Sequence, residues 1–387
     1  MWYFVSPKIV FGEDALDALE ELEGSRALIV TDQTLVKLGI VEKIQSRLRN
    51  NGFDTRVFDE VEPDPSLETV QRGVQIANQY QPDWIVALGG GSPMDAAKSI
   101  WVLYEHPEMQ AGEITPIVQL KMGSKAHLAT IPTTSGTGSE VTWGIVLTNQ
   151  AEQRKMGLGN RANLADIAIV DPALAAGMPP QLTADTGLDA LTHAVEGYTC
   201  AWHNDFADGM CLVAARLVMT YLPRAVANGK DMEAREHLHN AAACAGLGFS
   251  NALVSVAHAM GHTLGATFHI PHGRAVGLVL PYTIEFCAAE APERFVDLGK
   301  FIGCVNQDGQ AGARQLAQAI RGLCQTIGEP LSLHQAGLDE KAFENALEKM
   351  IDDAFNDASM VSSSRSPGYD ELRQIFRCAY YGTPVDF

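Results

Sequence analysis

The sequence predicts an N-terminal α/β domain with a parallel, doubly wound sheet and a C-terminal domain made only of helices. At 387 residues the chain is long for a single hydrophobic core. Short apolar runs alternate with amphipathic stretches in its first half, which is typical of parallel strands joined by crossover helices. Beyond residue 182 the apolar residues recur at helical spacing almost everywhere. We therefore expect two domains, residues 1–182 and 183–387, with the change of pattern at Met178-Pro179-Pro180.

The elements of the first domain are expected in a regular order. Asn51-Gly52 marks the end of its first helix, and Ser66 is a suitable N-cap for the second. Between these helices the segment VEPDPS carries two prolines, which exclude regular structure there. The expected strands cover residues 26–32, 55–58, 83–88, 126–131, 144–149 and 167–171, and the expected helices cover residues 34–50 and 66–80.

Composition excludes several classes of protein. The chain is 46% hydrophobic and 19% charged, which argues against disorder. Its net charge of −19 argues against nucleic acid or an anionic membrane as a partner, since both need concentrated Lys and Arg. Seven scattered cysteines without a CxxC motif indicate free thiols in a reducing compartment. Residues 237–273 carry no Asp, Glu, Lys or Arg, but glycines and histidines interrupt the apolar run, so we expect buried helices rather than a membrane span. With no targeting segment visible at the N-terminus, the expected location is cytoplasmic.

Two glycine- and hydroxyl-rich loops follow predicted strands. The first is Gly89-Gly90-Gly91-Ser92, with Pro93 at a suitable first helical position. The second is IPTTSGTGSE, residues 131–140. In a parallel sheet such loops lie where ligands bind, and a helix N-terminus offers free N–H groups to a phosphate. Either loop alone could be a tight turn, but two after successive strands indicate a nucleotide site. The usual GxGxxG fingerprint after the first strand is absent, so a standard Rossmann motif is not claimed.

A group of residues in the helical half has the spacing of metal ligands. Asp189 and His193 are four residues apart, as are His258 and His262, and His272 follows shortly after. On a helix, residues four apart share one face. Imidazole and carboxylate ligands without thiolate suit Fe(II), Zn, Ni or Co better than Ca or Mg. A single buried His is usually a core residue, but five such residues in this arrangement indicate a metal site.

These motifs resemble those of the iron-containing (group III) alcohol dehydrogenases over nearly the whole chain. The resemblance implies a Rossmann-like nucleotide-binding domain and a helical metal-binding domain with the active site in the cleft between them. This architecture is shared with dehydroquinate synthase and glycerol dehydrogenase. The stretches that carry it are GGGSPMDAAK at 89–98, PTTSGTGSEVT at 132–142, KMGL at 155–158, DPALAAGMPPQLTADTGLDALTHAVEGY at 171–198 and HAMGHTLGATFHIPHG at 258–273.

The resemblance also implies roles for single residues. His262 lies between metal and nicotinamide, where it either relays a proton or only supports the site. Asp32 binds the adenosine ribose, which favours NAD over NADP. The implied metal ligands are Asp189, His193, His258 and His272. The implied cofactor contacts are Asp32, Gly90, Gly91, Ser92, Asp95, Thr133, Thr134, Thr137 and Lys155.

The implied reaction is hydride transfer between a small primary alcohol, or a short diol, and NAD, with Fe²⁺ or Zn²⁺ as a Lewis acid. A glycerol dehydrogenase-like polyol enzyme is the first alternative, and the chain is expected to form a dimer or larger homo-oligomer. A lyase of the dehydroquinate synthase type would need several cations near the metal, and no Lys or Arg adjoins a ligand motif before Arg274. A non-catalytic nucleotide- or metal-binding protein is the third alternative.

Some positions depart from the family pattern and bear on the substrate. Asp64 stands where an Asn is common, and Gly144 stands where some relatives have a polar pocket residue. The segment at 359–369 differs from the common NPR-type sequence. The resemblance puts Phe249 at the pocket wall, so we expect an uncharged substrate. Arg365 is the one cation that could reverse this expectation by folding over the site.

Overall fold

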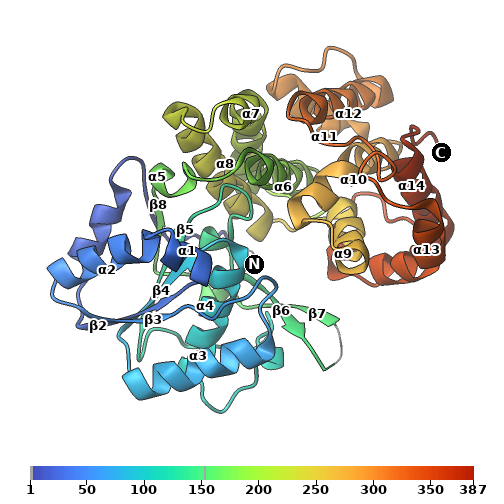
Figure 1. The fold of residues 1–387 in the computed structure, drawn as a ribbon. Helices are drawn as coiled ribbons and strands as arrows, with labels where there is room; N and C mark the ends of the chain where they lie inside the picture. The colour runs from blue at the N-terminus through green and yellow to red at the C-terminus, as the bar shows by residue number, and fades with distance from the viewer. Residues whose placement is uncertain (1–2, 152–153) are drawn as a thin grey trace. The chain divides into compact units, whose positions relative to one another are not determined.

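The computed structural model describes residues 3–151 and 154–387 and divides the chain into two compact units (Figure 1). The α/β unit comprises residues 5–177, and the helical unit comprises residues 178–387 with the N-terminal segment up to Phe4. The predicted boundary, between residues 182 and 183, falls in the first turn of the first long helix of the helical unit, Pro180–Thr199.

The α/β unit is built on a six-stranded parallel sheet, which confirms the predicted fold class. The spatial order is β1-β8-β5-β4-β2-β3. The first strand of the chain, β1, forms one edge of the sheet and was not predicted. The six strands are β1 (Lys8–Phe11), β2 (Arg26–Val30), β3 (Asp54–Phe58), β4 (Trp84–Gly89), β5 (His127–Pro132) and β8 (Ile167–Val170).

Alternation along the buried strands separates two layers of core. Leu28 and Val30 of β2 pack on one face, in the same apolar cluster as residues of α3 and α4. Ala27 and Ile29 pack on the other face, with residues of η1 and α2. Both faces are therefore covered, as all-parallel sheets require. The elements of this unit that cover the sheet or connect its strands are η1 (Ala15–Glu21), α1 (Gln33–Lys37), α2 (Ile40–Asn50), α3 (Leu67–Tyr80), α4 (Gly91–Glu105), η2 (Ala111–Glu113), η3 (Ser139–Val141), η4 (Arg161–Asn163) and α5 (Pro172–Ala175).

Two local features differ from the sequence-based expectation. The helix expected over residues 34–50 is two helices, α1 and α2, because Gly39 adopts a left-handed conformation with φ of 72°. The strand expected over 144–149 is present as β6 (Gly144–Asn149), but it pairs antiparallel with β7 (Arg154–Gly159) outside the main sheet. Ser66 caps α3 as predicted, since its side chain accepts a hydrogen bond from the Thr69 backbone N–H.

The helical unit contains no strand among its described residues, as predicted. Its elements are α6 (Pro180–Thr199), α7 (Asp205–Ala227), α8 (Met232–Ser250), α9 (Val256–Phe268), α10 (His272–Cys287), α11 (Pro292–Phe301), α12 (Gly309–Thr326), α13 (Glu340–Phe355), η5 (Ala358–Ser362) and α14 (Tyr369–Tyr381). The helix α6 is central, because α7, α8 and α10 all pack against it. One large apolar cluster, drawn from residues 184–385, forms the core of this unit.

The charge-free segment 237–273 forms most of α8, all of α9 and the start of α10, in agreement with the buried helices expected there. A different helix, α7, has the length and the mean hydropathy (1.4) that could cross a membrane. It packs against α6 and α8 inside the helical unit, so this is weak evidence for a span.

Candidate metal centre and nucleotide-binding loops

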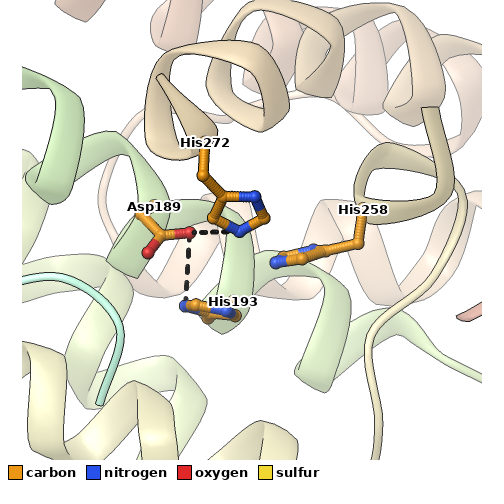
Figure 2. A group of neighbouring side chains, drawn as sticks. All are labelled: Asp189, His193, His258 and His272. Carbon is orange, nitrogen blue, oxygen red and sulfur yellow. Dashed lines mark ion pairs between the residues drawn. The ribbon is translucent and has the colours of Figure 1, made fainter. Parts of the chain in front are cut away.

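Four side chains of the helical unit converge on one point (Figure 2). Asp189 and His193 lie one turn apart on α6, His258 lies in the first turn of α9, and His272 is the first residue of α10. Each offers one ligand atom, and these atoms all lie within 4.8 Å of one another. These are the four residues that sequence reasoning put forward as metal ligands.

Local packing explains why the start of α10 comes so close to α6. Gly273 lies against the α6 backbone, where an added Cβ would come 2.1 Å from the carbonyl oxygen of Asp185. No larger residue fits there without a shift of the backbone. Gly273 therefore lets its neighbour His272 reach Asp189, whose carboxylate Oδ1 is 3.4 Å from His272 Nε2.

The polar atoms of this cluster are poorly satisfied by the protein itself. Asp189 Oδ1 is also 3.7 Å from His193 Nδ1, so both of its contacts are long. Among the described residues, no hydrogen bond is made to Asp189 Oδ1, His193 Nδ1 or His258 Nε2, although all three atoms are buried. Buried polar atoms are normally paired. One carboxylate and three imidazoles without a thiolate are also the ligands that Fe(II) or Zn accepts, so the residues fit a divalent metal.

The electrostatics of the cluster favour the metal-binding forms of its members. Burial lowers the pKa of His193 to about 3 and holds the pKa of His258 well below its usual value, which keeps both rings neutral. Burial opposes ionisation of Asp189, but the His193 and His272 rings beside it hold the pKa of this carboxyl well below its ordinary range. Neutral imidazole and ionised carboxylate are the forms that bind metal.

Another buried group, Glu196, contacts His258 on the side of its ring away from the cluster. Its Oε2 atom lies 2.5 Å from His258 Nδ1 and accepts the backbone N–H of Ser255 at 3.0 Å, while Oε1 accepts the backbone N–H of Ala257. Burial raises the pKa of Glu196 to about 7, and these backbone donors oppose the rise. Sequence reasoning missed Glu196. One signal in the sequence could have found it. Glu196 lies three residues after His193 in an apolar helix, and a charged residue in a buried helix needs a partner.

His262 lies beside the four residues, but it is not part of the group whose ligand atoms all lie within 4.8 Å of one another. Its ring stacks on His272 with centroids 5.4 Å apart, and its Nδ1 lies 2.9 Å from Asp357 Oδ2. Although burial disfavours the charged carboxylate, the hydrogen bond from His262 holds the pKa of Asp357 at about 2. Asp357 is the N-cap of η5 and lies two residues before the divergent segment 359–369, and nothing in the sequence connected it with His262.

The other side chains considered for the substrate pocket are either apolar or already paired with an opposite charge. Phe249 stacks on the His193 ring with centroids 4.1 Å apart. Arg274, two residues after His272, is paired with both Asp185, at 3.0 Å, and Glu329, at 2.9 Å. Arg365 packs on the Phe286 ring and pairs with Glu371 at 2.7 Å. The two arginines are thus already engaged with carboxylates of the helical unit.

In the α/β unit, the order of the strands brings the glycine-rich loops together. The chain leaves β2 for β3 on one side and returns to β4 on the other side, so the topological switch point lies between β2 and β4. Ligands of such sheets bind outside the carboxyl ends of the strands at this point. Added Cβ atoms on Gly90 and Gly91 would come 3.4 Å from Thr134 Oγ1 and 3.3 Å from Thr137 Cγ2, so the first loop lies directly against the second.

Lys155 reaches the same place through an ion pair. Its Nζ lies 2.7 Å from Asp64 Oδ1, and the backbone N–H of Asp64 donates to Ser92 Oγ at 3.3 Å. Asp64 has a left-handed conformation, with φ of 56°, which Asp and Asn adopt more readily than most residues. The structure therefore brings together the predicted pyrophosphate loop, the second loop and the predicted ribose lysine.

Asp95 and Asp32, two further predicted cofactor contacts, make hydrogen bonds within the protein. Asp95 is partly buried and accepts from Ser139 Oγ at 3.0 Å and from the backbone N–H of Val146 at 2.9 Å. Asp32 caps α1, because its Oδ1 accepts the backbone N–H groups of Thr34 and Leu35. Both assignments to the cofactor stay predictions.

A buried lysine that sequence reasoning did not single out, Lys98, ties these segments together. Its ammonium donates to Ser139 Oγ, Thr142 Oγ1 and the carbonyl oxygen of Gly144, each at 3.1 Å. Burial lowers the pKa of Lys98 to about 8 and raises the pKa of the neighbouring Glu140 carboxyl to about 7. The helix α4, the second loop and the β6–β7 hairpin thus share one buried polar network.

An α/β unit with paired nucleotide-type loops and a helical unit with an Asp-His₃ cluster define a class, the metal-dependent oxidoreductases linked to a nucleotide cofactor. Residues 6–172 match the family of iron-containing alcohol dehydrogenases, and residues 183–380 match the C-terminal part of the Fe-containing alcohol dehydrogenase family. The chain belongs to the iron-containing alcohol dehydrogenase family.

Individual relatives and solved structures agree with this membership. The chain is 39% identical to an NADPH-dependent butanol dehydrogenase of Clostridium saccharobutylicum over 390 residues, which cover 100% of both. It is 40% identical to the bifunctional aldehyde-alcohol dehydrogenase of Escherichia coli over 99% of this chain, but it spans only 46% of that longer protein. The crystal structure of a 1,3-propanediol oxidoreductase is similar, with a TM-score of 0.93, 34% identity and coverage of 98% and 100%. A sulfoacetaldehyde reductase of Bifidobacterium kashiwanohense in complex with NAD⁺ has a TM-score of 0.88, 27% identity and coverage of 98% of each chain.

Proposed function

We propose that this chain is a metal-dependent, NAD-linked alcohol dehydrogenase, or aldehyde reductase, acting on small primary alcohols or diols. The observation that carries the proposal is the convergence of Asp189, His193, His258 and His272, with buried atoms that no described residue satisfies. A divalent ion held by these four residues, Fe²⁺ or Zn²⁺, supplies Lewis acidity at the oxygen of the alcohol or aldehyde. Every other part of the reaction has to come from the cofactor and from this chain's own residues.

Metal binding and substrate orientation fall to different residues of the helical unit. Asp189 supplies the negative charge, and the neutral rings of His193 and His258 supply nitrogen lone pairs. Phe249, stacked on His193, gives the substrate's carbon chain an apolar surface. This arrangement suits a small, uncharged molecule.

His262 is the residue that we propose to move the proton. It lies within ring contact of His258 and His272, yet it is not one of the four clustered ligands. Its Nδ1 hydrogen bonds to the Asp357 carboxylate, which leaves Nε2 to exchange a proton on the opposite side of the ring. Histidine is suited to such a relay at neutral pH. The alternative, that His262 only supports its neighbours, predicts a much smaller loss of rate when it is replaced.

The cofactor proposal is NAD, held by the two loops at the switch point of the sheet. Gly90, Gly91 and Ser92 begin α4, so their backbone can approach a pyrophosphate at the helix N-terminus. Asp32 at the end of β2 favours a ribose 2′-hydroxyl over a 2′-phosphate. The NAD⁺ complex of the similar sulfoacetaldehyde reductase supports this proposal, whereas the name of the butanol dehydrogenase relative favours NADP. Both cofactors therefore belong in the test.

The substrate proposal depends on Arg274 and Arg365, the two arginines considered for the pocket, being already paired with carboxylates. Burying a carboxylate or phosphate without a partner costs several kcal/mol or more. Arg274 is already paired with Asp185 and Glu329, and Arg365 with Glu371. A polyol such as glycerol is the alternative within the same chemistry. A cytoplasmic location and a homo-oligomeric state remain part of this proposal.

The test is an absorbance screen for NADH and NADPH on protein reconstituted separately with Fe(II) and Zn. Butanol, 1,3-propanediol, glycerol and a hydroxy acid of matched length are compared by kcat/KM. We expect the uncharged primary alcohols to be preferred and the hydroxy acid to be poor. Preference for the hydroxy acid, or stoichiometric binding of cofactor and metal without turnover of any of these substrates, would contradict the proposal.

A further inference from the structure

We infer that Glu196 is a positioning residue that fixes the tautomer of His258 so that Nε2 of this ring is available to a metal. The inference rests on the proposed metal site and adds a residue to it that is not itself a ligand. It concerns the chain of contacts Glu196–His258–cluster, which α6 and α9 bring together.

The geometry identifies which nitrogen faces which partner. Glu196 Oε2 lies 2.5 Å from His258 Nδ1, and both side chains are almost fully buried, with 6% and 3% of their surface exposed. The other ring nitrogen, Nε2, is buried as well and makes no hydrogen bond with any described residue. One nitrogen of His258 is therefore bonded to a carboxylate, while the other lies among the ligand atoms of Asp189, His193 and His272.

The backbone groups bonded to Glu196 indicate the direction of this hydrogen bond. Both of its oxygens accept backbone N–H groups at the start of α9, from Ser255 and from Ala257. Because Oε2 already accepts a backbone N–H and Oε1 accepts another, the geometry makes Oε2 an acceptor toward His258 Nδ1 as well. The Nδ1–H of His258 then donates to Glu196, and Nε2 carries the lone pair. A carboxylate behind a ligating histidine also makes the ring a stronger ligand.

Glu196 also has a purely structural task, because it satisfies backbone groups at the start of α9. A loss of metal after its replacement could therefore come from a disturbed helix rather than from the ring. Glu285 provides a matched control: it is a buried glutamate of the same unit, 5% exposed, paired with Arg321. It lies near the far end of α10, about 20 Å along the helix from His272.

The experiment compares Glu196→Gln and Glu196→Ala with Glu285→Gln in the full chain. Metal affinity is measured by competition with a chromophoric chelator, using Zn²⁺ and Fe²⁺, and the melting temperature of the metal-free protein is recorded for each variant. Nitrogen-15 NMR of imidazole-labelled, metal-free wild type reports which nitrogen of His258 carries the proton. We expect protonated Nδ1 in the wild type and metal affinity about 10–100-fold weaker in both Glu196 variants. Glu285→Gln should bind metal as the wild type does, at a similar or greater cost in melting temperature.

The inference would be overturned by a proton on Nε2 of His258 in the metal-free wild type, or by a loss of affinity below about threefold in Glu196→Gln. An equal loss of affinity in Glu285→Gln would do the same, since it would trace the effect to general destabilisation. Failure of the proposed function looks different. In that case the wild type itself binds no divalent metal, while the NMR measurement still decides the tautomer of His258.

Discussion

Replacing Asp32 by Asn or by Ala should separate two roles that this carboxylate can combine. Its Oδ1 accepts the backbone N–H groups of Thr34, at 2.7 Å, and of Leu35, at 3.1 Å, which makes it the N-cap of α1. Its position after β2, at the switch point of the sheet, is also where a carboxylate can discriminate between NAD and NADP. Asn is as good an N-cap as Asp but carries no charge, whereas Ala removes both properties.

The expected magnitudes follow from these two roles. Losing the cap in Asp32→Ala should cost about 1 kcal/mol of unfolding free energy. For a unit of about 170 residues this lowers Tm by about 2–4 °C. A 2′-phosphate with a charge between −1.5 and −2, held about 6 Å from a carboxylate, is repelled by about 1–2 kcal/mol. Removing that charge should therefore raise the NADP to NAD ratio of kcat/KM by about 5–30-fold in both variants.

Thermal unfolding of each variant and kcat/KM for both cofactors test these numbers. The expected pattern is a changed cofactor ratio in Asp32→Asn and Asp32→Ala, with a lowered Tm only in Asp32→Ala. If Asp32→Asn leaves the ratio unchanged, the carboxylate acts as a cap alone and the cofactor argument is refuted. If Asp32→Ala unfolds at the wild-type temperature, the cap contributes nothing measurable.

Three further predictions concern the metal cluster, the buried network and the substrate. His258→Ala and His272→Ala should lose most of their bound metal while their circular dichroism spectra stay those of the folded protein. His262→Ala should keep its metal but have a lower kcat. Wild-type metal content in the first two variants would reject the ligand assignment. Glu140 has its pKa raised to about 7 by burial, so its proton stabilises the folded state below pH 4.5, and this contribution is lost as pH rises through 7. The side chain of Glu140→Gln is neutral at every pH. This variant should therefore gain stability relative to the wild type between about pH 4.5 and 7, by an amount on the order of a few kcal/mol. A difference in unfolding free energy between the two proteins that does not depend on pH, measured in denaturant melts, would contradict this. Arg365→Ala should leave the preference for butanol over a matched hydroxy acid unchanged, since this arginine is paired with Glu371; a substrate preference that changes would place Arg365 at the pocket.

Patterns within one element were enough to predict most of the fold. The strand β4 is a continuous apolar run that ends in Gly89, and Ser66 precedes α3 as a cap should, so period and capping chemistry located both elements. The pairing of β6 with β7 could not be predicted in the same way. The segment 154–159 has little apolar character of its own, and its strand conformation depends on hydrogen bonds to β6.

The candidate site could likewise be predicted only where its residues belong to one element. Asp189 and His193 are four residues apart on one helix, so their common face follows from helix geometry. The partners behind the histidines do not follow from spacing. Glu196 meets His258 across 62 residues of sequence, and Asp357 meets His262 across 95, because packing between different elements brings them together. Such pairs depend on tertiary structure, which local periodicity does not contain.

Among the residues that the structure describes, the hydrophobic cores of the two units share no member. The helical core draws on residues 184–385, and the two cores of the α/β unit draw on residues 15–174. The four residues proposed as metal ligands belong to the helical unit, and the glycine-rich loops belong to the α/β unit. A ligand that binds only the folded form stabilises the part of the protein that holds it, by RT ln(1 + [L]/Kd). Heat unfolding followed by calorimetry therefore shows which unit binds which ligand. A chelator should lower the unfolding temperature of the unit that contains α6, α9 and α10, and added NAD should raise that of the unit that contains the parallel sheet.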